Sequence, residues 1–74
     1  MTSMKNKLKD ILLLVKWSTV STDYFGKTRT WIYQRISGYD VNGKAAEFSP
    51  AERERLREAL HDIAARINAA ADNI

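Results

Sequence analysis

Residues 20–38 have the sequence VSTDYFGKTRTWIYQRISG, in which Gly26 separates two short apolar-patterned runs and Gly38 closes the second. Glycine adopts the left-handed backbone conformation without a steric penalty, so both glycines are predicted to end helices. The first helix is expected over residues 19–25, with three apolar side chains on one side, Val20, Tyr24 and Phe25. The second is expected over residues 28–37, with Thr28 as N-cap and an inward side formed by Trp31 or Ile32 together with Ile36.

A further helix is predicted before this pair, over residues 3–16. Apolar residues recur there at three- and four-residue steps, and Thr2 or Ser3 can act as N-cap; the apolar positions are Met4, Leu8, Ile11, Leu12 and Val15. Leu13 and Leu14 widen this apolar side beyond what a surface helix needs, which indicates burial on two sides or a partner.

The clearest helix signals belong to residues 50–70. Ser49 and Glu52 have the spacing of a capping box, and Pro50 lies in the first turn, where its missing N–H has no cost. An apolar stripe follows at Leu56, Leu60, Ile63, Ile67 and Ala70, reinforced by Ala59 and Ala64. Three acidic and basic pairs are spaced to meet on the outer side, Glu52–Arg55, Glu54–Arg57 and Asp62–Arg66.

Residues 39–48 are expected to form a loop or a short hairpin. Asn42-Gly43 is a strong hairpin-turn signal, and Val41 and Phe48 would flank it as a short ribbon, although the flanks lack a regular alternation. The sequence thus predicts an all-α, compact four-helix helix-turn-helix domain that spans residues 1–74 as a single unit.

The composition excludes several classes of function. Without cysteine there is no disulfide, Cys-based zinc site or thiol nucleophile, and the lone His61 supplies neither a metal cage nor a catalytic triad. The longest apolar run, residues 11–15, is far below the roughly 18–20 residues of a membrane span. We therefore expect a cytoplasmic protein with no enzymatic activity, cofactor, metal or membrane partner. Trp17 and Trp31 are expected in the core, because so short a chain needs its large apolar side chains there.

The net charge of +3 is unevenly divided along the chain. Residues 1–46 carry eight Lys or Arg and three Asp or Glu, whereas residues 47–74 carry four and six. The first part is therefore at +5 and the second at −2. This division favours a polyanion as the partner of one face.

Residues 20–38 resemble the helix-turn-helix of the phage-repressor (Cro-like) family. The shared features are Phe25-Gly26 at the turn, Thr28-Arg29-Thr30 at the opening of the second helix, Ile32 within it, and Gly38 twelve positions after Gly26. The order of one helix before the pair and a long helix after it is also similar. The sequence departs from the family at three positions, Ser21 in place of an apolar residue, Thr22 in place of a small Ala, and Arg35 where the apolar residue is displaced to Ile36.

The resemblance implies that residues 28–37 enter the major groove of double-stranded DNA. Base contacts would come from Thr28, Arg29, Thr30, Tyr33 and Gln34, and phosphate contacts from Lys27, Arg35 and Lys44. Considered by composition alone, the same residues would be only the solvated side of a short helix.

The chain also resembles a family of short gut-bacterial proteins classed as a domain of unknown function. The shared stretches are YFGKT at 24–28, WIYQR at 31–35, VNGK at 41–44 and FSP at 48–50. This resemblance covers most of the chain and implies no activity.

Two functions follow as alternatives. The first is a DNA-binding transcriptional regulator that forms a homodimer through its C-terminal helix, because the apolar stripe continues beyond the reach of a small core at Ile63, Ile67, Ala70 and Ile74. The second is a small helical module that binds another protein through its first or last helix. The aromatic residues Tyr24, Trp31 and Tyr33 and the aliphatic run at 11–15 favour this alternative.

Overall fold

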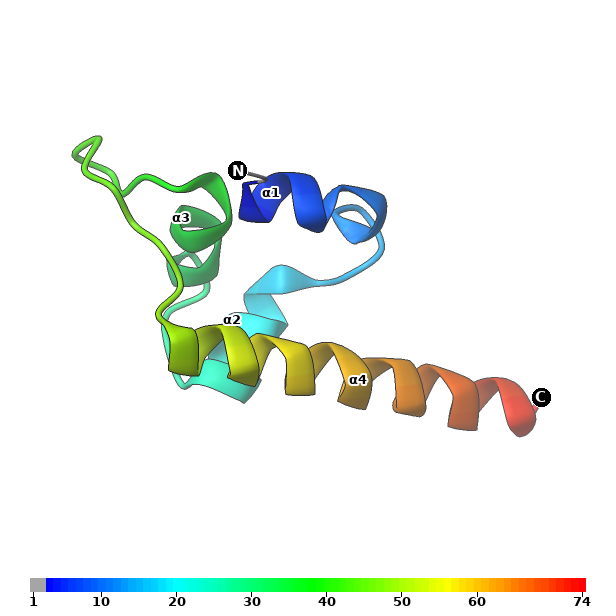
Figure 1. Ribbon diagram of the computed structural model, residues 1–74. Coiled ribbons are helices and arrows are strands. Elements are labelled where there is room, and N and C mark those ends of the chain that lie inside the picture. Colours follow the sequence, from blue (N-terminus) through cyan, green and yellow to red (C-terminus); the bar gives the residue numbers. More distant parts are fainter. Residues whose placement is uncertain (1–2) are drawn as a thin grey trace.

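The computed structural model describes residues 3–74 and confirms an all-α architecture (Figure 1). Four α-helices and one 3₁₀ helix follow one another in the order α1 (Met4–Lys7), η1 (Lys9–Ile11), α2 (Trp17–Phe25), α3 (Trp31–Ser37) and α4 (Pro50–Asp72). No strand is present over residues 3–74. Within the same range, no helix combines the length and the apolar character that crossing a membrane requires.

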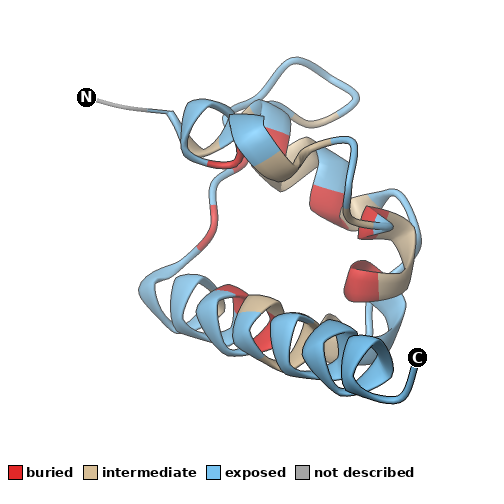
Figure 2. Ribbon diagram, turned by 90° about the vertical axis from the view of Figure 1, so that its right-hand side faces the viewer, coloured by how far each residue is buried: buried red, intermediate tan, exposed pale blue. Residues whose placement is uncertain are grey.

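The core lies where α2, α3 and the first half of α4 meet the N-terminal segment. Figure 2 marks the buried residues in red, and those that form the hydrophobic core cluster are Leu8, Trp17, Val20, Ile32, Ile36, Phe48, Leu56 and Ala59. Three aromatic rings pack along one side of the core, with centroids 5.0 Å apart for Phe25 and Trp31 and 6.0 Å apart for Trp31 and Phe48. Trp17 is buried as expected, whereas Trp31 is only half-buried because Ile32 takes the inward position.

The single helix predicted over residues 3–16 is wrong, because the chain bends after α1 and η1. Ser3 is the N-cap, with its hydroxyl accepting a hydrogen bond from the Asn6 amide at 3.2 Å; the alternative cap, Thr2, lies outside the described residues. At the bend, the carbonyl of Leu12 accepts a hydrogen bond from the indole N–H of Trp17 at 2.9 Å, which withdraws this carbonyl from a continuing helix. The bend allows Leu8 to join Trp17, the first residue of α2, in the core but leaves Leu13 and Leu14 exposed.

The long C-terminal helix is confirmed and reaches Asp72, two residues beyond its predicted end. Ser49 and Glu52 form the expected capping box, with distances of 3.1 Å and 2.8 Å for its two hydrogen bonds. Glu52 is thereby engaged at the cap, and the ion pairs on the helix are Glu54–Arg57 at 3.8 Å and Asp62–Arg66 at 3.1 Å. The apolar stripe is buried only in its first half, because every residue from 64 to 74 is exposed.

Residues 39–48 form a turn with one antiparallel bridge, between Tyr39 and Ala45, rather than two strands. A turn forms one residue earlier than Asn42-Gly43, because the amide of Gly43 donates to the carbonyl of Asp40 at 3.1 Å and Val41 and Asn42 are its central residues. Gly43 follows with a φ of +79°. Val41 is exposed whereas Phe48 is buried beside the rings of the core, so these two residues do not pair as the flanks of a ribbon. The packing of Phe48 draws the chain toward the start of α4 and ends the pairing after one bridge.

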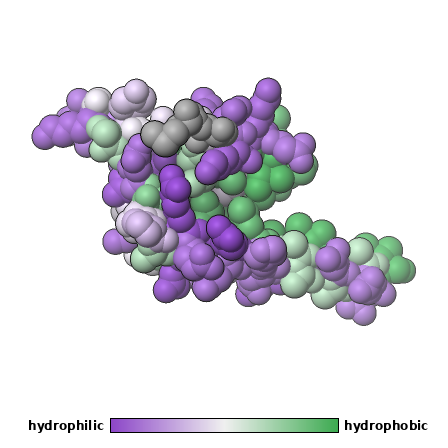
Figure 3. All heavy atoms as spheres, viewed as in Figure 1, coloured by the Kyte–Doolittle hydropathy of each residue, from purple (hydrophilic) through white to green (hydrophobic). Residues whose placement is uncertain are grey.

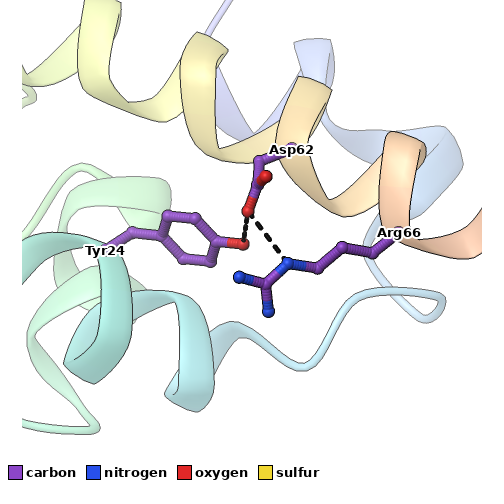
Figure 4. A network of polar contacts seen from close by, with 3 residues as sticks. All are labelled: Tyr24, Asp62 and Arg66. Atoms are coloured by element: carbon purple, nitrogen blue, oxygen red, sulfur yellow. Dashed lines mark hydrogen bonds and ion pairs between the residues drawn. The ribbon is translucent and has the colours of Figure 1, made fainter.

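The side chain of Tyr24 connects α2 to α4 (Figure 4). Its phenol O–H donates a hydrogen bond to Oδ2 of Asp62, and the same oxygen pairs with Nε of Arg66 at 3.1 Å. The backbone carbonyl of Tyr24 also accepts a hydrogen bond from Arg55 at 3.3 Å. The hydrogen bond to Asp62 raises the pKa of Tyr24 above 10.0, since the carboxylate holds the phenolic proton, and the positive charge of Arg66 acts in the opposite direction.

We expect the ionisation of Tyr24 to lie above pH 10.0 and to depend on Asp62. The protonated phenol makes the hydrogen bond, so its contribution to folding is complete below pH 10.0 and is lost as the pH rises through the raised pKa. Asp62→Asn should lower the pKa of Tyr24, and Tyr24→Phe should remove the corresponding step from a spectrophotometric titration of tyrosinate. A titration that Asp62→Asn leaves unchanged would contradict the contact.

Candidate nucleic-acid interface

The turn between α2 and α3 is built around Gly26 and Ser21. Gly26 ends α2 with a φ of +63°, as the sequence predicted, and the amide of Lys27 donates to the carbonyl of Ser21 at 3.0 Å. The hydroxyl of Ser21, which is fully buried, donates a hydrogen bond to the carbonyl of Thr28. Ser21 is therefore the small residue where α2 packs against α3, and Thr22 is exposed. The Cro-like pattern instead has an apolar residue at position 21 and the small residue at position 22.

The second helix begins at Trp31, three residues later than predicted. The carbonyl of Thr28 is shared between the hydroxyl of Ser21 and the amide of Trp31, which closes a turn ahead of the helix. Thr28 is therefore not the N-cap, and Thr30, which holds that position, makes no capping hydrogen bond with its side chain. The turn is correspondingly long, over residues 26–30, and the helix ends at Gly38 with a φ of +90°, as predicted.

The residues predicted to contact bases lie partly in this turn and partly on α3. Thr28, Arg29 and Thr30 form one exposed segment, and the amide of Tyr33 on α3 donates to the carbonyl of Thr30 at 3.2 Å. Tyr33 is 46% exposed, whereas Gln34 is half-buried. Four of the five predicted base contacts are thus exposed to solvent, and the fifth, Gln34, is less accessible.

The residues predicted to contact phosphate lie in two different places. The ammonium group of Lys27 is 5.9 Å from the centroid of the Trp31 ring, and the guanidinium group of Arg35 is 5.1 Å from it. A cation–π contact of this kind contributes about 0.5–2 kcal/mol of interaction free energy and so helps to hold the basic group in position. Lys44 belongs instead to the exposed turn at 39–45, where the carboxylate of Asp40 accepts a hydrogen bond from its amide at 2.9 Å.

Sequence reasoning missed the contact of Trp31 with both basic residues. The spacing of Trp31 and Arg35, four residues apart on a helix, was the available signal. Nε of Arg35 is buried without a hydrogen-bond partner among the described residues, and the guanidinium group lies near the Trp31 ring.

Arg29 lines a shallow recess of about 260 Å³ together with residues of α2. The recess also includes Lys16, whose contribution the sequence did not indicate, and one acidic residue, Asp23. The remaining lining is hydroxylic, from Ser18, Thr19 and Thr22. Over residues 3–74, no group of three or more His, Asp or Glu side chains is arranged to hold a metal ion.

These features define an all-α domain in which two short helices cross through a glycine turn beside a long C-terminal helix. The chain belongs to the DUF5053 family, described as a domain of unknown function, whose profile matches residues 4–74. No curated protein and no solved structure matches the chain. The family confirms the resemblance to short proteins of unknown function and gives no support to the resemblance to Cro-like repressors.

The Ser21 hydroxyl is expected to be essential for the geometry of the turn. Ser21→Ala leaves the site filled but removes the donor to Thr28, and should lower the free energy of unfolding by about 1 kcal/mol. Ser21→Val adds volume at a position with no exposure and should cost about 1–3 kcal/mol. Urea denaturation followed by tryptophan fluorescence measures both, with the half-buried Ser18→Ala on the same helix as control. Equal stability of all four proteins would show that the contact has no energetic importance.

Proposed function

We propose that this protein binds double-stranded DNA through α3 and the turn before it, as a transcriptional regulator. The observation that carries the proposal is the exposed segment Thr28-Arg29-Thr30, which leads directly into Tyr33 on a short helix anchored by buried Ile32. A segment that is exposed on one side and fixed to the core on the other suits the reading of base edges in a major groove.

The side chains of this surface match the chemistry of base pairs. A guanidinium group such as that of Arg29 can donate two hydrogen bonds to O6 and N7 of guanine, and Gln34 can bind N6 and N7 of adenine. Hydroxyl groups of Thr28, Thr30 and Tyr33 can bind either bases or phosphates. The half-buried position of Gln34 makes Arg29 the stronger candidate for a specific contact.

The charge of the surface is also suited to DNA. Residues 24–39 include Lys27, Arg29 and Arg35 and no acidic residue. Within residues 26–38, Tyr33 is the one large hydrophobic residue that is exposed, which favours a charged partner over an apolar protein surface at this site. Lys27 and Arg35, held near Trp31, are placed to contact phosphate, with Lys44 on the neighbouring turn as a further candidate.

A homodimer through the C-terminal helix forms part of the proposal. A helix of seven residues such as α3 reads few base pairs, and helix-turn-helix proteins gain specificity by placing two copies on half-sites about 34 Å apart. The exposed second half of α4 provides apolar surface for such an association.

Arg29→Ala is expected to weaken binding to a preferred duplex by about 1–3 kcal/mol and to relax the base preference at one position. Fluorescence anisotropy measures this with a duplex that the wild-type protein selects from a random pool. Arg57→Ala removes the same charge from an exposed position on α4 and serves as the matched control. Equal affinity of the wild-type and Arg29→Ala proteins, or failure of the wild-type protein to select any duplex, would refute the proposal.

Lys27→Ala is expected to weaken binding to all duplexes alike, because a phosphate contact has no base preference. Titrations at several salt concentrations should show the salt dependence of binding reduced by about one phosphate contact. A change of base preference without a change in salt dependence would show that Lys27 contacts bases instead.

A further inference from the structure

An apolar groove of about 390 Å³ separates the N-terminal bend from the second half of α4. Leu14 and Val15 form one wall, α2 forms the floor, and the third side consists of Ile63, Ile67 and Ala70. In Figure 3, hydrophobic residues of the N-terminal segment and of α4 border the recess from both sides. The walls of the groove are mainly apolar, and the charged residues Lys16, Asp23 and Arg66 also line it.

Further apolar surface flanks this groove. Leu13 is 100% exposed, Leu14 79% and Ile67 62%, and Ile74 at the end of the chain is fully exposed. Single exposed aliphatic residues are ordinary, but here they accumulate on the two segments that form the groove walls or continue from them. The same chain thus carries an apolar groove and an apolar helix end that its own core does not use.

The second half of α4 is complementary to itself. Residues 63–74 carry one Arg and one Asp, so two copies meet without net repulsion, and Arg66 is already paired with Asp62. The residues Ile63, Ile67 and Ala70 follow helical spacing and share one side of the helix, and Ile74 follows two residues after its end. In an antiparallel pair with its two-fold axis between residues 68 and 69, Ile67 lies opposite Ala70 of the second copy and Ile63 lies opposite the segment that ends in Ile74. A large residue facing a small one, as at Ile67 and Ala70, permits close helix packing.

We infer that two copies of this chain form a symmetric dimer in which the end of α4 of each copy occupies the groove of the other. The occupant is a second copy because the side of α4 that borders the groove can pair with itself in the antiparallel register, and a two-fold interface requires one surface that is complementary to itself. The role of this dimer in a DNA-binding regulator rests on the proposed function. The groove and the register of the paired helices do not depend on DNA binding.

The size of the interface supports the participation of the bend as well as the helix. The paired segments of α4, the 10 residues 63–72 in each copy, are about 15 Å long and one helix wide. A stable interface buries about 800 Å² on each partner, more than such a narrow contact supplies. Leu14 at the groove wall and the exposed Leu13 beside it offer further apolar surface to the second copy. This requirement distinguishes the inference from a contact between C-terminal helices alone.

Sedimentation of the full chain over a range of micromolar concentrations tests the inference. The wild-type chain should dimerise, and Ile67→Asp and Leu14→Asp should each raise the dimer dissociation constant about 100-fold, because each places a charge in the interface twice. Ala65→Asp introduces the same charge on the opposite side of α4, two residues from Ile67, and should leave the dissociation constant unchanged. Circular dichroism should show that all three variants fold, since the replaced side chains are exposed.

Three results would overturn the inference: a wild-type chain that stays monomeric, a Leu14→Asp variant that dimerises as the wild type does, or an Ala65→Asp variant as impaired as Ile67→Asp. A monomer would leave the groove to a different protein. The DNA proposal is tested separately, because Arg29→Ala should lower the affinity for DNA and leave the mass of the dimer unchanged. A dimer that binds no DNA would refute the proposed function and leave the interface intact.

Discussion

The crossing of α2 over α3 depends on three side chains that solvent does not reach, Val20, Ser21 and Ile32. Ser21 is small enough to let the two helices approach, and its hydroxyl satisfies the carbonyl of Thr28 on the returning chain. The same carbonyl also accepts a hydrogen bond from the amide of Trp31, so the two donors together hold the turn against the start of α3. A hydrogen bond of this kind contributes about 1 kcal/mol to stability. The bend before α2 and the first half of α4 are packed against the pair that results.

The same crossing divides α3 between packing and recognition. Ile32 and Ile36 hold the helix to the core, which leaves Tyr33 and the preceding turn facing solvent. Trp31 lies between the two roles, because its ring packs against Phe25 and Phe48 while two basic side chains lie near it. Two basic groups are thereby held near the core, which would reduce the conformational entropy lost in the proposed binding of DNA.

The long helix α4 is divided at the contact between Tyr24 and Asp62. Before that point its apolar side covers α2, with Leu56 and Ala59 buried; beyond it the helix extends past the core. A chain of 74 residues has too small a core to cover 23 residues of helix, so continued apolar spacing at Ile67 and Ile74 has no intramolecular partner. The exposed half is consequently the part of α4 to which the proposed self-association assigns a role.

The sequence by itself determined the helix ends at Gly26, Gly38 and Ser49, because glycine conformations and capping hydrogen bonds are local. It also determined the all-α class, since helical periodicity is a property of the chain. Only the tertiary structure decided where the N-terminal segment bends and where α3 begins. Both depend on hydrogen bonds between side chains and distant carbonyls, from Trp17 to Leu12 and from Ser21 to Thr28. Helical spacing contains no information about such contacts. It shows which residues share a side of a helix, but not which backbone carbonyl will accept a hydrogen bond from a side chain in the folded chain.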